Sequence, residues 1–375
     1  ALVQYFKDSY NNYKIFKGVF YHTVAGQPLY AQYPEAYFDS NHYGPLFSVL
    51  IAPFALMPDI VGMTLWSLAN TWLLYKAITM LPLSVTQRTA VLWIAFIELT
   101  TAQHSFQVNP SIAAWIIMTF VFVAARRPQL APLFALLGFF VKIYGLVALV
   151  FGAFSKDKWK LLFFLLLWTL ILFALPMVLS SPDYIVDAYQ DWTKALIRKN
   201  GQNAELQPAG NMQNISVIGM ITRVFHLPLL PLWTVLLPAA FLMLAPLLRW
   251  KLYHDTLFQL YYLAAVLLSI VLFSTGSESP TFIIAVTGAA IFFVVQPAPW
   301  RGWTLFLLCF MLLLTCLSPT DIFPRSLRKS IIQPYALKAL PCLLIWATII
   351  YSLLTKKFIH VESRQQAGIH HNPAF

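Results

Sequence analysis

The chain has 375 residues, of which 59% are hydrophobic and 10% charged, and its mean hydropathy is +0.69. A water-soluble protein of this length cannot keep so much apolar surface out of water, so the composition argues against that class and predicts an all-α, polytopic membrane protein. The net charge of +11 would suggest nucleic-acid binding in a soluble protein, but basic clusters on the cytoplasmic side of membrane helices explain it more simply.

Residues 1–45 are polar and aromatic and contain no apolar run long enough to cross a membrane. We expect them to form a first extracytoplasmic loop, after a membrane helix that precedes the given sequence. The short apolar segment 44–57 either dips into the membrane or pairs with the next helix. The expected membrane helices follow at 60–81, 89–102, 111–125, 159–179, 227–248, 257–274, 280–295, 303–317 and 335–354.

Basic clusters set the expected orientation of these helices. Lysine and arginine gather at 126–127, 156–160, 249–251, 301 and 356–357. The positive-inside bias puts these clusters in the cytoplasm. The polar segment 180–213 is then a second large extracytoplasmic loop, followed by a short helix over 214–225. Residues 356–375 are a cytoplasmic tail, and the whole chain, 1–375, is a single integral membrane domain.

The apolar stretch 130–154 lies between two basic clusters, which the positive-inside bias prefers on the same side of the membrane. Two half-helices that turn near 142–145 satisfy this preference and bring Lys142 to a turn deep in the protein. One long tilted helix is the alternative, and both interpretations remain open. Glu98 also lies in an apolar run, where charges are expensive and face a bundle interior. A structural ion pair between Glu98 and Lys142 is one explanation for both.

The segment 33–45 concentrates carboxylates, tyrosines and a histidine directly before an apolar run. Asp39, beside His42 and Tyr43, is a candidate general base for an acceptor hydroxyl group. A helix-capping or solvated aspartate is the structural alternative. Asp8 and Asn12 form a second candidate pair, for which a surface loop is the usual explanation.

Further candidates come from the expected outer loops. Glu278, pinned close to the membrane, is a catalytic candidate, with an interfacial ion pair as the alternative. Lys142 and Arg223 are the best candidates for binding a lipid phosphate. The amides of Gln107 and Asn109 either bind sugar hydroxyl groups or satisfy helix ends. No phosphate-binding glycine loop and no metal-ligand spacing is present in the sequence.

Several short motifs together resemble glycosyltransferase family 87. They are Gly-Gln-Pro-Leu-Tyr at 26–30, Tyr-Gly-Pro-Leu-Phe-Ser at 43–48 with the run at 51–58, Gln107 with Asn109, Phe140 to Lys142, Asn214 with Ser216, Gly219 and Arg223, and the stretches 278–285 and 317–325. The last two are similar to the variant of this family found in Bacteroidota. The resemblance covers nearly the whole chain, although each motif is short.

This resemblance implies a polytopic fold of the GT-C type with the site formed by extracytoplasmic loops. It also implies transfer of a sugar, often mannose or another hexose, from a polyprenyl-phosphate donor with inversion, and an outer-loop aspartate as base. The aspartate that is usual in this family aligns with Asn12 better than with Asp8. The family's histidine-containing motif is replaced in this sequence by the motif that begins at Glu278. Asp39 is therefore the first choice for the base.

The expected reaction is direct displacement of the lipid phosphate by a hydroxyl group of a lipid or glycan acceptor. Asp39, Asp8 or Glu278 takes the proton, and Lys142 and Arg223 stabilise the phosphate. We expect His42, Tyr43, Gln107, Asn109, Asn12 and Asn214 to bind the sugar or acceptor. No metal or other cofactor is expected, because phosphate is a competent leaving group. The expected location is the inner membrane of a bacterium. A transporter or flippase of an anionic lipid-linked sugar, or a non-catalytic envelope subunit, are the alternatives.

Overall fold

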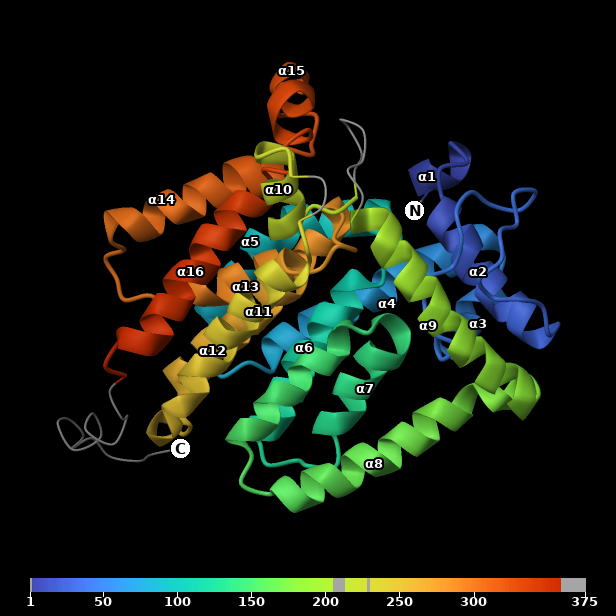
Figure 1. Cartoon of the computed structure of the whole chain (residues 1–375), viewed down its shortest axis with the longest axis horizontal. Helices are drawn as coiled ribbons and strands as arrows, with labels where there is room; N and C mark the ends of the chain where they lie inside the picture. Colours follow the sequence, from blue (N-terminus) through green and yellow to red (C-terminus); the bar gives the residue numbers. More distant parts are fainter. Residues whose placement is uncertain (1, 205–212, 228–229, 359–375) are drawn as a thin grey trace, which may run out of the picture.

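The protein is built from helices. A computed structural model describes residues 2–204, 213–227 and 230–358, and every regular element in these ranges is helical. The predicted all-α class is therefore confirmed. The first half of the chain, blue to green in Figure 1, contains α1 (Leu2–Phe6), α2 (Asn11–Val24), α3 (Phe47–Ala55), α4 (Asp59–Thr79), α5 (Val85–His104), α6 (Asn109–Ala124), α7 (Ala131–Lys142) and the 3₁₀ segment η1 (Tyr144–Phe154).

The second half begins with α8 (Lys158–Ala174), which continues into η2 (Leu175–Val178). The other elements are α9 (Pro182–Ala204), α10 (Val217–Val224), α11 (Trp233–Leu244) with η3 (Ala245–Leu248), η4 (Trp250–Leu252), α12 (Thr256–Leu272), η5 (Ser279–Thr281), α13 (Phe282–Val294), α14 (Gly302–Phe310) with the π-helical η6 (Met311–Leu317), α15 (Arg325–Leu327) with η7 (Arg328–Ile332), and α16 (Ala339–Thr355). The short helix expected over 214–225 is thus present as α10.

The core lies around α12 and α13. Almost every residue of these two helices is buried, which fits their apolar composition on all sides. They pack against each other, α13 also packs against α5, and α12 also packs against α16. On the other side of this core, α6 joins α4 to α7, so the N-terminal helices and the α12–α13 pair share one continuous interior.

The stretch 130–154 is a hairpin, as one of the two sequence interpretations predicted. α7 ends at Lys142, Ile143 turns the chain with a φ of 33°, and η1 packs back against α7. Gly145 makes this close return possible, because a Cβ atom there would lie 2.3 Å from the carbonyl oxygen of Ala135. The turn leaves Lys142 at the end of α7, beside the candidate site.

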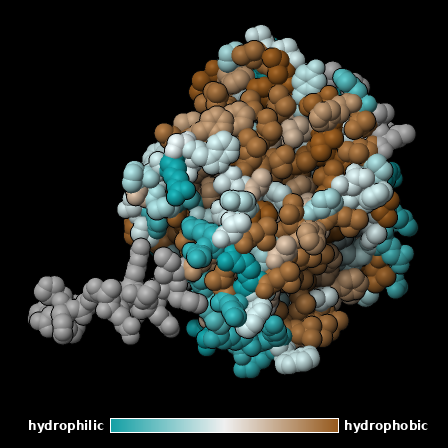
Figure 2. Space-filling view, turned by 60° about the vertical axis from the view of Figure 1, so that its left-hand side comes forward, coloured by the Kyte–Doolittle hydropathy of each residue, from teal (hydrophilic) through white to brown (hydrophobic). Residues whose placement is uncertain are grey.

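One helical segment among the described residues, Lys158–Val178, is both long and apolar enough to cross a membrane alone. Only 11% of its most apolar window is buried. It lies along the lower edge of Figure 1. Several shorter apolar helices of 10–17 residues accompany it. Figure 2 shows a broad hydrophobic surface bordered by hydrophilic patches, and large apolar side chains such as Phe241 and Trp303 are exposed.

The polar segments are more helical than the sequence suggested. The expected loop 180–213 contains α9, a helix of 23 residues. Its buried residues, Ile185, Ala188, Trp192 and Ala195, recur at helical spacing, so an amphipathic stripe holds it against the protein. Residues 1–45 contain α1 and α2, and the segment 318–330, between two of the expected membrane helices, contains α15 and the start of η7. The tail that we predicted over 356–375 lies, from residue 359 on, outside the described residues.

Candidate active site

A cavity of about 780 Å³ lies where the loop around Asp39 meets α2, α7, α9 and the loop before η5. Segments far apart in the sequence thus contribute to one space, of a size usual for small-molecule sites. Seven predicted site residues line it: Asn12, Asp39, His42, Tyr43, Gln107, Lys142 and Glu278. The other lining residues are Asn11, Ile15, Phe16, Phe38, Ser40, Ile143, Tyr144, Leu196, Lys199, Asn200, Asn203, Gln213, Ser274, Thr275 and Gly276.

Close backbone packing fixes the loop that carries Asp39 and His42. The backbone N–H of Gly44 donates a hydrogen bond to the carbonyl of Val141, 3.1 Å away. A Cβ atom on Gly44 would lie 2.1 Å from the carbonyl oxygen of Phe140, so only glycine permits this approach. From the other side, the indole N–H of Trp192 on α9 donates to the carbonyl of His42 at 3.0 Å. The loop is therefore held between α7 and α9.

Asp39 is part of this loop and caps no helix, since α3 begins only at Phe47. Its backbone has a φ of 78°, in the left-handed region, where strained residues often belong to functional sites. One carboxylate oxygen accepts a hydrogen bond from the N–H of Ser40 at 2.8 Å. The same oxygen lies 3.8 Å from Nε2 of His42, and the other lies 3.9 Å from Nζ of Lys199. Asp39 therefore faces polar partners from both its own loop and α9.

His42 presents unused hydrogen-bonding capacity to the cavity. Both ring nitrogens are buried and have no hydrogen-bond partner among the described residues. Burial lowers the pKa of His42 to about 4, and the nearby charge of Lys199 acts in the same direction, against that of Asp39. The imidazole is thus neutral at pH 7 and offers one donor and one acceptor to a ligand.

Lys142 is the cation at the tip of the α7–η1 hairpin. Its Nζ donates to Oδ1 of Asn109 over 2.9 Å and lies over the rings of Tyr43 and Tyr144, at 5.9 and 5.1 Å from their centroids. The hydroxyl group of Tyr43 in turn donates to Oε1 of Gln107 at 2.9 Å. Burial raises the pKa of the Tyr43 phenol, which therefore remains a neutral hydrogen-bond donor.

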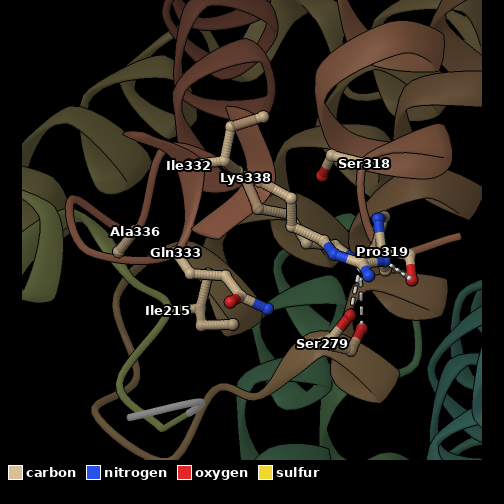
Figure 3. A pocket seen from close by; sticks show the side chains of 9 residues that line it. Ile215, Ser279, Ser318, Pro319, Ile332, Gln333, Ala336 and Lys338 are labelled. Carbon is tan, nitrogen blue, oxygen red and sulfur yellow. Dashed lines mark hydrogen bonds between the residues drawn. The ribbon is translucent and has the colours of Figure 1, made fainter. Parts of the chain in front are cut away.

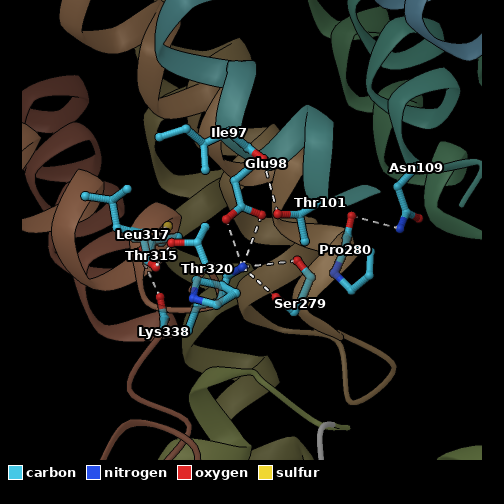
Figure 4. A network of polar contacts seen from close by, with 12 residues as sticks. Ile97, Glu98, Thr101, Asn109, Ser279, Pro280, Thr315, Leu317, Thr320 and Lys338 are labelled. Carbon is cyan, nitrogen blue, oxygen red and sulfur yellow. Dashed lines mark hydrogen bonds and ion pairs between the residues drawn. The ribbon is translucent and has the colours of Figure 1, made fainter. Parts of the chain in front are cut away.

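The ion pair that we considered between Glu98 and Lys142 does not form. Glu98 pairs instead with Lys338, whose Nζ lies 2.9 Å from Oε1 and also donates to the hydroxyl and carbonyl oxygens of Ser279 (Figure 4). Both side chains of this pair are buried, at 0% and 5% exposed. The prediction failed because Lys338, on the segment leading into α16, reaches the polar environment that Glu98 needs, while Lys142 faces the cavity.

Glu278 lies in the loop between α12 and η5 and lines the same cavity as Asp39. Burial raises its pKa, while the charges of Lys142 and Lys199 oppose that shift. The loop is fixed by a hydrogen bond from the N–H of Ile215 to the carbonyl of Ser277, at 2.7 Å. Glu278 therefore has a fixed position among opposite charges.

The next residue, Ser279, borders a second and much smaller cavity of about 60 Å³ (Figure 3). Its other lining residues are Ile215, Ser318, Pro319, Arg328, Ile332, Gln333, Ala336 and Lys338. The turn at 278–279 thus separates the two cavities, and the Lys338 ammonium group holds it from the side of the smaller one.

Four predicted site residues do not line the large cavity. Asp8 is 72% exposed and pairs with Lys14. Arg223 donates to backbone carbonyls, that of Gln213 at 2.7 Å and that of Gln333 at 3.5 Å. Asn214 donates to the carbonyl of Asn203 and accepts from the hydroxyl group of Ser216, which caps α10. Asn109 accepts a hydrogen bond from Lys142 but does not itself line the cavity. Asn12 lines the cavity while its amide donates to the carbonyl of Ser105.

Sequence reasoning missed the contribution of α9. Lys199, Asn200 and Asn203 line the cavity together with Leu196. A signal for them exists, because Lys199 and Asn203 continue the helical spacing of the buried stripe from Ile185 to Ala195. We interpreted the polar segment 180–213 as a loop, and its helical spacing was therefore overlooked.

Comparison with known protein families finds one that matches this chain. The family described as Glycosyltransferase family 87 matches residues 41–275, more than half of the chain. The matched span includes His42, Lys142 and all of α9, and it ends shortly before Glu278. No curated protein matches the chain significantly.

Proposed function

Because the chain belongs to glycosyltransferase family 87, we propose that it transfers a sugar from a polyprenyl-phosphate donor to a hydroxyl group of a lipid or glycan acceptor. The observation that supports this proposal most is the set of charges around one cavity. Lysines from α7 and α9 and carboxylates from two loops line the same space. Lys142 suits a phosphate, and Asp39 suits a proton from a hydroxyl group.

The reaction is a displacement at the anomeric carbon. The acceptor oxygen bonds to this carbon, and the bond from the carbon to the phosphate oxygen breaks with its electron pair going to the phosphate. The acceptor proton goes to the carboxylate of Asp39. Lys142 stabilises the charge that develops on the leaving phosphate. Attack from the side opposite the phosphate inverts the configuration. Arg223 does not line the cavity and donates to backbone carbonyls, so this mechanism gives it no contact with the phosphate.

Amides, hydroxyl groups and aromatic faces on the walls suit a sugar. Asn12, Gln107 and Tyr43 lie on the wall near α2, and the neutral imidazole of His42 has free ring nitrogens. Such groups hydrogen-bond hydroxyl groups, and apolar ring faces pack against tyrosine. We propose a hexose, with mannose as the first to test.

We further propose that the chain is a multi-pass protein of a bacterial inner membrane with this cavity on the extracytoplasmic side. The segment Lys158–Val178 supports one crossing, and the shorter apolar helices and the exposed hydrophobic surface suit others. In this arrangement residues 1–45 and 180–213 are outside, where a lipid-linked sugar is presented.

The experiment is direct. The purified full chain in lipid nanodiscs is incubated with polyprenyl-phosphate sugars labelled in the sugar, together with a native lipid extract. We expect label in a new product, together with release of polyprenyl phosphate. In proteoliposomes, movement of intact donor across the membrane without transfer would contradict the proposal and indicate a transporter.

A further inference from the structure

Two lysines line the large cavity, and the sequence predicted only one of them. Lys199 comes from the C-terminal half of α9 and is 20% exposed. Its Nζ lies 3.9 Å from the carboxylate of Asp39. Its charge also acts on His42 and on Glu278, as does that of Lys142. Lysines from α7 and from α9 therefore line one cavity and act on the same two titratable groups.

Lys194 lies on the same helix and has the exposure and pairing of an ordinary surface lysine. It is 74% exposed, pairs with Asp191 on α9 itself at 2.9 Å, and does not line the cavity. Such exposed pairs contribute little. Lys199, in contrast, is largely covered and reaches another loop. Its position is therefore not explained by solvation of the helix surface.

We infer that Lys199 is the second cation for the donor phosphate, and that its charge is shared between Asp39 and that phosphate during transfer. This inference rests on the proposed function. Two lysines, Lys142 and Lys199, and two carboxyl groups, Asp39 and Glu278, line the cavity. The donor is a phosphodiester and brings one negative charge.

The reaction then moves one negative charge without changing the total. Asp39 becomes neutral when it takes the acceptor proton, and the leaving polyprenyl phosphate gains a charge, so that it carries close to two. Lys199 loses its partner at the moment when the phosphate needs a second cation. An interaction that strengthens only as the reaction proceeds lowers the barrier, whereas one equally strong before it does not. Lys199 should therefore affect kcat more than the KM for the donor.

The test compares Lys199→Met and Lys199→Gln with Lys199→Arg and with the matched control Lys194→Met, all in the full chain in nanodiscs. We expect both neutral variants to lose at least about tenfold in kcat, as for the loss of one charge-assisted contact. Lys199→Arg should retain most of the activity, and Lys194→Met should match the wild type. Thermal unfolding of each variant shows whether it is folded.

A binding measurement separates charge from packing. The probes are a polyprenyl monophosphate and the corresponding polyprenol, each titrated into the protein in nanodiscs. The wild type should prefer the phosphate, and the neutral Lys199 variants should lose about tenfold of this preference. If the wild type transfers sugar and the Lys199 variants behave as Lys194→Met in both assays, the inference is wrong while the proposed function stands. If the wild type transfers no sugar, the proposed function itself fails.

Discussion

Lys142 is hydrogen-bonded to Asn109, and this contact connects α7 to the loop that carries Glu278. Nζ of Lys142 donates to Oδ1 of Asn109 at 2.9 Å, and the amide nitrogen of Asn109 donates to the carbonyl of Pro280 at 3.1 Å. Pro280 follows Glu278 by two residues, so one asparagine side chain fixes the distance between the α7 cation and the loop of Glu278. Asn109 thus positions charges in the cavity without lining it.

Lys142→Met should lower kcat/KM for the donor at least about tenfold, because one charge-assisted contact is worth about 1.5–3 kcal/mol. Asn109→Ala should produce a smaller loss in the same direction, since the lysine remains but is no longer held. Arg223→Met should lower the melting temperature with little effect on kcat/KM, because Arg223 binds the carbonyls of Gln213 and Gln333. Steady-state kinetics and thermal unfolding measure these effects. A larger kinetic loss for Arg223→Met than for Lys142→Met would contradict this assignment of the phosphate site.

Asp39→Asn should lower kcat about 10²–10⁴-fold, the range for loss of a general base, while binding of the donor is largely kept. Asp8→Asn separates the two aspartates that the sequence left in competition, and we expect it to remain close to wild type because Asp8 is exposed and outside the cavity. Glu278→Gln completes the comparison. If Asp39→Asn turns over normally and Glu278→Gln is inactive, the base is Glu278.

The lowered pKa of His42 predicts that the stability of the protein depends on pH. Burial lowers its pKa from 6.5 to about 4, so between these values the unfolded chain binds a proton at His42 that the folded chain does not. Protons then favour unfolding, and the contribution of His42 to stability decreases as the pH falls from 6.5 towards 4. We expect His42→Gln, which does not titrate, to reduce the decrease in melting temperature over this range. An unchanged pH dependence would show that His42 is not buried as a neutral group.

The buried pair of Glu98 and Lys338 should behave as a unit. Removal of one partner leaves the other charge buried, which typically costs about 3–5 kcal/mol. Glu98→Gln and Lys338→Met should therefore each lower the melting temperature strongly, and the double variant should recover part of the loss. Lys338 also holds Ser279 (Figure 4), so Lys338→Met should disturb Glu278 and lower activity even under conditions in which the protein is folded. Additive losses in the double variant would argue against the pair.

Local signals predicted much of this site, and long-range contacts explain what they missed. The concentration of Asp39, His42 and Tyr43 in one loop, and the turn after Lys142, are visible in the sequence because neighbours in the chain create them. The partner of Glu98 was not visible, since Lys338 is 240 positions away.

The polar segment 180–213 shows a second limit. Its charged residues suggested a loop, although spacing of its apolar residues already indicated one helical face. Composition and periodicity disagreed there, and the structure follows periodicity. Lys199 lies on that helical face. Because the segment was interpreted as a loop, Lys199 was not among the predicted site residues. The family resemblance did not help, because its motifs do not include this helix.

Whether the segment of α8 and η2 crosses a membrane can be tested without any substrate. The segment Lys158–Val178 has 21 residues, which as a helix span about 32 Å, close to the thickness of the hydrocarbon core. If it crosses, Lys158 is in the cytoplasm, as its basic neighbours favour, and α9 is outside. Gly201 is exposed and has room for a side chain, and Lys158 is exposed as well. A thiol at either position is therefore accessible from its own side.

In a background with the three native cysteines replaced, an impermeant maleimide added to intact cells should label Gly201→Cys and not Lys158→Cys. Both positions should react once the membrane is permeabilised, which controls for accessibility. Labelling of Lys158→Cys alone in intact cells would reverse the orientation and place the cavity in the cytoplasm, where a donor presented on the outer face is out of reach. Labelling of both positions in intact cells would mean that this helix does not cross the membrane at all.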